Sequence, residues 1–132
     1  MRIAEHQESF EEHKETIFRW ALEVKGIDKS QRIIGLHASR AILDLLSIYL
    51  LKKGKMSPGK QINHRWFKSG KVSDKLPDFK NKNQITEKII KLELLCEKLT
   101  YGSQRSETEI KTALELFNEI EAKIKNLENE KE

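Results

Sequence analysis

Four side chains of one predicted helix have the types and spacing of an acid–base site. They follow one another at steps of three and four residues on an otherwise apolar helix: His37, Arg40, Asp44 and Ser47. Such steps place side chains on one stripe of a helix. An imidazole oriented by a carboxylate can act as a general base, but the same stripe is typical of an internal hydrogen-bonded network or a dimer contact. We therefore treat His37, Arg40 and Asp44 as weak catalytic candidates and expect a structural role for them.

A second group of candidates lies in a basic segment over residues 52–82. The segment has ten basic residues against two acidic ones, whereas the whole chain has a net charge of only +4. Basic side chains interleaved with aromatic ones favour a phosphate backbone with exposed bases. The residues expected to bind such a partner are Lys60, His64, Arg65, Trp66 and Lys68. A solvated lysine-rich loop whose aromatic residues cover one end of the fold is the alternative.

Metal and thiol chemistry have weaker sequence support. His6 and His13 lie near several glutamates, but two histidines with flexible carboxylates make a poor metal site. Cys96 falls among apolar helix positions, where a buried and inert thiol is expected. The sequence has no glycine-rich phosphate loop and no zinc-protease motif. It therefore predicts no metal, no cofactor and no convincing catalytic motif.

The elements that must position these residues are predicted to be helices throughout. Apolar residues recur at three- and four-residue steps over four segments, about 8–25, 28–53, 84–101 and 106–128. In the first segment this spacing predicts that Trp20 and Val24 face inward with Ile17. Asp28 has the spacing of an N-cap for the second helix, and Ser106 with Glu109 forms a capping box for the last one.

The predicted fold is all-α: a single domain over residues 1–132, built as an antiparallel up-and-down bundle of four helices. The long basic loop over residues 54–83 joins helices two and three, and a short helix over 59–69 would make a fifth. The second helix is apolar around most of its circumference, so we expect it at the centre of the bundle. Surplus apolar surface on the first or second helix would favour a homodimer.

The composition also indicates where the protein works. The amino-terminal residues lack the apolar core of a signal peptide, and polar residues interrupt the longest apolar stretch. A single cysteine is suited to a reducing compartment. We therefore expect a cytoplasmic protein that does not enter a membrane.

Two stretches of the chain resemble HEPN domains. The run LHASRAILDLLSIYLLKKGKMSPGKQINHRWFKS is similar to their central helix with the following turn and histidine-bearing short helix. The run KLTYGSQRSETEIKTALELFNEIEAKI is similar to their closing part. This resemblance implies a bundle of four or five helices that dimerises and acts either as a ribonuclease or as a non-catalytic partner of a small nucleotidyltransferase.

The catalytic motif of the HEPN ribonucleases does not carry over to this sequence. That motif is an arginine followed by four to six residues and a histidine, late in the fold. Here Arg32 and His37 alone have this spacing, and they fall at the start of the second helix. Near the late position, Arg105 has no histidine beside it. The favoured function is therefore a non-catalytic module that docks RNA, a nucleotide substrate or a nucleotidyltransferase subunit on the basic loop. The alternatives are a HEPN-type ribonuclease at a dimer cleft and a purely structural homodimer.

Overall fold

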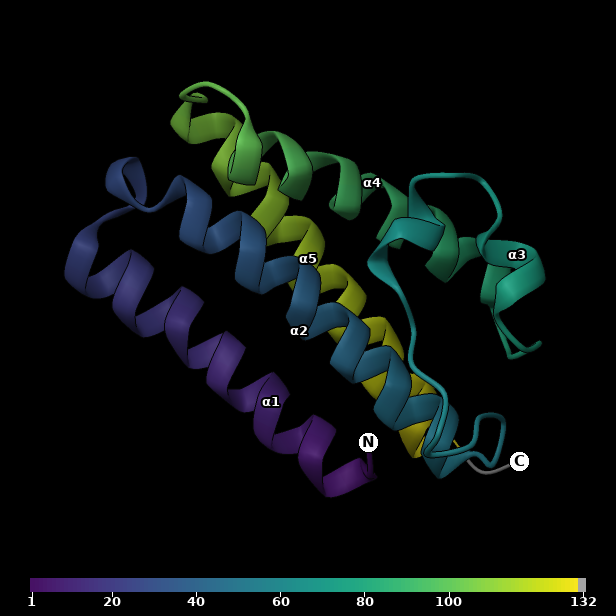
Figure 1. Cartoon of the computed structure of the whole chain (residues 1–132). Helices are drawn as coiled ribbons and strands as arrows, with labels where there is room; N and C mark the ends of the chain where they lie inside the picture. The colour runs from purple at the N-terminus through teal and green to yellow at the C-terminus, as the bar shows by residue number, and fades with distance from the viewer. Residues whose placement is uncertain (131–132) are drawn as a thin grey trace.

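Helices are the only regular secondary structure in the part of the chain that the computed structural model describes, residues 1–130 (Figure 1). No strand occurs among these residues, which confirms the all-α prediction. The four long segments are α1 (Ile3–Glu15) continued by the π-helix η1 (Thr16–Lys25), α2 (Gln31–Lys52), α4 (Lys82–Tyr101) and α5 (Glu107–Asn129). Three short elements complete the chain: the 3-10 helices η2 (Ile27–Lys29) and η3 (His64–Phe67), and α3 (Val72–Lys75).

Helix α2 occupies the centre of the molecule. It contacts α1, α4 and α5 (Figure 1), and most of its side chains are buried. By length and composition alone α2 could cross a membrane, but 78% of its most apolar window is buried inside the protein. Burial by three neighbouring helices explains why apolar residues surround most of this helix.

The π-helical segment η1 changes which residues of the first helical segment face the core. Trp20 and Val24 were expected inside, but they are 53% and 65% exposed. A π-helix has more residues per turn than an α-helix, so a spacing of three no longer returns to the same face. Ile17 and Ala21 are buried instead, and Phe18 packs against the core from the side.

The helix ends agree with the sequence in one case and differ in two. Ser106 caps α5, since its Oγ accepts a hydrogen bond from the Glu109 backbone N–H at 3.2 Å. The residue before α2 is Ser30 rather than the predicted Asp28, and the Ser30 hydroxyl donates to the carbonyl oxygens of Ala21 and Gly26. The first helix also begins at Ile3, five residues earlier than its amphipathic pattern indicated.

The connection between α2 and α4 is held firmly against the bundle. In place of the single helix expected over 59–69, it contains η3 and α3. Phe67 and Val72 are buried in the core. The Lys82 ammonium group donates to the carbonyl oxygens of Ser73 at 2.9 Å and Leu76 at 2.8 Å. As a result, η3 lies against both α2 and α4 and presents its side chains beside the centre of α2.

Candidate functional site

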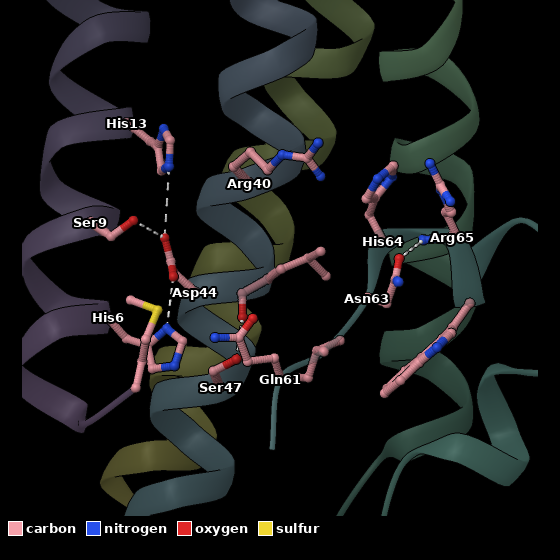
Figure 2. Close-up of a pocket in the computed structure, with 14 residues that line it drawn as sticks. His6, Ser9, His13, Arg40, Asp44, Ser47, Gln61, Asn63, His64 and Arg65 are labelled. Atoms are coloured by element: carbon pink, nitrogen blue, oxygen red, sulfur yellow. Dashed lines mark hydrogen bonds and ion pairs between the residues drawn. The ribbon is translucent and has the colours of Figure 1, made fainter. Parts of the chain in front are cut away.

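A pocket of about 570 Å³ opens between α1, α2 and the segment that leads into η3 (Figure 2). Each of these elements contributes polar side chains to its wall. The polar residues that line it are His6, Ser9, His13, Arg40, Asp44, Ser47, Gln61, Asn63, His64 and Arg65. Asn63 stiffens the loop side of the pocket, because its Oδ1 accepts a hydrogen bond from the Arg65 backbone N–H at 2.9 Å.

Asp44 on α2 is the anchor for the α1 side of the pocket. Its Oδ1 accepts a hydrogen bond from His6 Nδ1 at 2.7 Å, and its Oδ2 accepts one from the Ser9 hydroxyl at 2.5 Å (Figure 2). A carboxylate can only accept here, so the proton of His6 lies on Nδ1. The other ring nitrogen, His6 Nε2, is buried and has no hydrogen-bond partner in residues 1–130.

His13 connects this cluster to a second histidine on α2. Its Nε2 lies 3.9 Å from Asp44 Oδ2, and its Nδ1 lies 2.8 Å from Nδ1 of His37. Burial lowers the pKa of His13 below the ordinary value of 6.5, and the nearby Asp44 carboxylate opposes that shift. Burial and the neighbouring His13 lower the pKa of His37 as well. Both imidazoles are therefore neutral at pH 7.

Arg40 occupies the middle of the site without a partner of its own. Its guanidinium points across the pocket toward His64 (Figure 2). Among residues 1–130 it makes neither a hydrogen bond nor an ion pair, although the side chain is partly buried. Arg40 also borders a second, narrow cavity toward α4, so the guanidinium lies between two cavities.

The side of the site toward α4 contains a buried carboxylate. Glu93 is only 2% exposed, and its Oε1 accepts a hydrogen bond from the Ser39 hydroxyl at 2.6 Å. Its Oε2 lies 3.8 Å from His64 Nδ1. Burial raises the pKa of Glu93. Burial and the positive charge of Arg40 lower the pKa of His64, so this imidazole is also neutral at pH 7.

The predicted binding residues of the basic loop divide among separate surfaces. His64, Arg65 and Trp66 line the main pocket. Lys68 borders the narrow cavity, and its ammonium group pairs with Glu97 at 3.2 Å. Lys60 lies in another depression, which Trp66 also borders. Trp66 packs partly against the core, so only part of its ring is open to a ligand.

Two members of the polar stripe of α2, His37 and Asp44, contact side chains of α1, whereas the Ser47 hydroxyl donates to the Leu43 carbonyl oxygen within α2. Arg40 and Asp44 both line the pocket. His37 was considered as a base oriented by Asp44, and the structure corrects that geometry: the partner of His37 is His13, which lies between His37 and the carboxylate. The single available Asp44 carboxylate is already used by residues of α1.

Three residues that line the pocket were not recognised from the sequence as parts of one site. Ser9 was not considered, and His6 and His13 were weighed only as metal ligands. Their spacing of three, four and seven residues places all three on one face of α1. Across residues 1–130, no group of three or more His, Cys, Asp or Glu side chains is placed to hold a metal ion. Glu93 was also missed, and its signal was an acidic residue within the apolar stripe of α4.

Comparisons with known proteins add no further assignment. No protein-family model matches this chain, and no curated protein or solved structure matches it either. The similarity to HEPN domains stays a prediction from the sequence. Any assignment of function therefore depends on the geometry of the pocket itself.

Proposed function

We propose that the pocket between α1, α2 and η3 binds the phosphate backbone of single-stranded RNA, and that the protein is a non-catalytic, cytoplasmic HEPN-like binding module. The observation that carries this proposal is Arg40. A guanidinium that is partly buried and unpaired lacks the carboxylate that usually accompanies it, and a bound phosphate supplies two acceptor oxygens for its fork of donors.

The surroundings of Arg40 support an anion rather than a cation as ligand. Arg65 lies on the facing wall with an exposed side chain. The carboxylates of Asp44 and Glu93 line the two cavities beside Arg40, but each accepts hydrogen bonds from other side chains and neither forms an ion pair with Arg40 within residues 1–130. A phosphate in the pocket therefore meets positive groups whose charge is not already neutralised.

His64 suits the same ligand. Because burial and Arg40 lower its pKa, His64 is neutral at pH 7 and its imidazole offers a donor and an acceptor. A phosphate beside His64 would favour its charged form and raise its pKa toward neutrality. Binding should therefore strengthen as the pH falls from about 7.5 to about 6.

The basic loop extends the surface beyond the pocket. Lys60 and Trp66 border the adjoining depression, so a strand that passes Arg40 can reach them. The ring of Trp66 is partly available for base stacking, which is worth about 1–3 kcal/mol per base in other proteins.

An up-and-down, antiparallel arrangement of the long helices is part of this proposal, because it keeps α1, α2 and η3 side by side.

The proposal is tested by fluorescence anisotropy with a labelled single-stranded RNA over a range of salt concentrations. Each phosphate neutralised on a single strand contributes a slope of about −0.7 in log K against log salt. Arg40→Ala should flatten the slope by about 0.7 and weaken binding at least tenfold. The matched control is Arg32→Ala, because Arg32 lies on the same helix but away from this pocket. Equal affinity of Arg40→Ala and the unmodified protein would reject the proposal.

A second candidate function is cleavage of the bound RNA, and one observation favours it. His64 is neutral at pH 7, with the Glu93 carboxylate behind one ring nitrogen and Arg40 beside it. This is the arrangement of a general base next to a group that stabilises developing negative charge. Cleavage of RNA, but not of the same strand with 2′-deoxyribose, that is lost in His64→Gln would establish it. A protein that neither binds nor cuts RNA would leave the purely structural role.

A further inference from the structure

The outer surface of the α4–α5 pair has a shallow apolar groove between the two helices. A cavity of about 460 Å³ lies there, with Leu94, Leu95 and Leu116 among its lining residues. Leu94 is 46% exposed, which is unusual for a leucine in the middle of a helix that otherwise packs well. The RNA pocket shares none of the residues of this groove, so the role of the groove is independent of the proposed function.

The two edges of the groove have opposite charges. The α4 rim is basic, with Lys91 and Lys98, and the α5 rim is acidic, with Glu115 and Glu119. Within residues 1–130, only Glu119 of these four has an ion-pair partner, Lys88 at 2.7 Å. Three charged side chains at the edge of an apolar surface thus make no ion pair within this part of the chain.

We propose that this groove is the interface of a symmetric homodimer, in which a second copy of the chain supplies the opposite charges. A two-fold axis that runs along the groove places α4 of each copy over α5 of the other at the same level. The leucines of α4 then face the α5 side of the other groove, and the basic rim of each copy meets the acidic rim of its partner. Opposite charges at the edge of an apolar centre favour this orientation over one that places α4 against α4.

In the structure, α2 has little apolar surface left for the dimer that was expected on the first or second helix. The apolar circumference of α2 made those helices the expected dimer surface. Helices α1, α4 and α5 cover α2 inside the molecule, so its apolar residues are already used. The exposed apolar strip on α4 and α5 has no such cover.

The decisive experiment uses two charge-reversed proteins. Lys91→Glu with Lys98→Glu makes both rims acidic, and Glu115→Lys with Glu119→Lys makes both rims basic. Each variant alone should dimerise at least tenfold more weakly than the unmodified protein, because like charges face each other. An equimolar mixture of the two should form a heterodimer, since every facing pair is then opposite in sign. Sedimentation velocity over micromolar concentrations measures the monomer–dimer equilibrium of each variant, of their mixture and of the unmodified protein.

Two further variants separate the interface from folding. Leu94→Asp should abolish the dimer while far-ultraviolet circular dichroism stays helical, because Leu94 is largely exposed. Lys71→Glu with Lys75→Glu reverses two exposed lysines outside the groove and should leave the dimer intact. A purely monomeric unmodified protein would overturn the proposal. So would charge-reversed variants that dimerise normally, or a mixture of them that stays monomeric.

Discussion

His13 on α1 and His37 on α2 meet with their Nδ1 atoms 2.8 Å apart. A hydrogen bond between two imidazoles needs one donor and one acceptor, so one of the two Nδ1 atoms has no proton. The Asp44 carboxylate favours a proton on Nε2 of His13. His13 Nδ1 is therefore the acceptor and His37 Nδ1 the donor, and this contact joins the two helices at the edge of the proposed RNA pocket.

The first prediction concerns stability against pH. The folded-state pKa values of His13 and His37 lie below the ordinary 6.5, so the unfolded chain takes up protons first as the pH falls. The stabilising contribution is fully present above pH 6.5 and is lost as the pH falls through the folded-state pKa values. The free energy of unfolding, from urea titrations, should therefore decrease between pH 7.5 and pH 5.

A variant isolates the histidine pair from the other titrating groups. His37→Asn should show a smaller decrease over the same interval, because one lowered pKa and the imidazole pair are removed. Lys29→Gln changes an exposed residue that does not titrate in this range and should keep the full decrease. An identical pH dependence in His37→Asn and the unmodified protein would contradict the assignment.

The second prediction concerns Asp44. Asp44→Ala removes the acceptor of both His6 and Ser9 and leaves two donors in a buried position. Each hydrogen bond to a charged group is worth about 1.5–3 kcal/mol, so we expect the free energy of unfolding to drop by about 3 kcal/mol. Asp28→Ala is the matched control at an exposed site and should change stability by less than about 0.5 kcal/mol. A loss as small as that of the control would show that the Asp44 cluster does not form.

The third prediction tests the close contact of α2 with α4. A Cβ at Gly35 would lie 2.8 Å from the backbone oxygen of Cys96 and 2.9 Å from Cβ of Leu99. Alanine is the better helix former by about 1 kcal/mol, yet Gly35→Ala should destabilise the protein by about 1–3 kcal/mol, because the two helices must move apart. A Cβ at Gly59 would have no neighbouring atom within 4 Å, so Gly59→Ala should be nearly neutral in thermal unfolding. A stabilised Gly35→Ala protein would disprove the close approach.

The fourth prediction tests the register of η1. Phe18 packs against Phe117, with ring centres 5.9 Å apart, whereas Trp20 is 53% exposed. Phe18→Ala should lower the free energy of unfolding by about 2 kcal/mol, and Trp20→Ala by less than about 1 kcal/mol. An uninterrupted α-helix, with Trp20 inside, would reverse this order. Urea unfolding of both variants decides between the two registers.

Much of the fold could be predicted from local pattern. Apolar spacing located the four long segments, and the Ser106 cap of α5 was predicted at the correct residue. Both features depend on residues within a few turns of one another. Trp20 and Val24 were assigned to the wrong face, because no local signal marks the change to π-helical spacing in η1. The sequence predicted the extent of the basic loop. It did not predict that residues of this loop would line different cavities.

The sequence by itself determined the helical class of the protein, the apolar face of most helices and the excess of positive charge over residues 52–82. Only the tertiary structure decided that His6, Ser9 and His13 lie opposite Asp44, and that His64 lies between Arg40 and Glu93. The reason is physical: periodicity defines a face of one helix, but contacts between helices depend on their axial shift and separation. The axial shift and separation of the helices are set by packing across the whole core, including the close contact at Gly35. No single stretch of sequence contains that information.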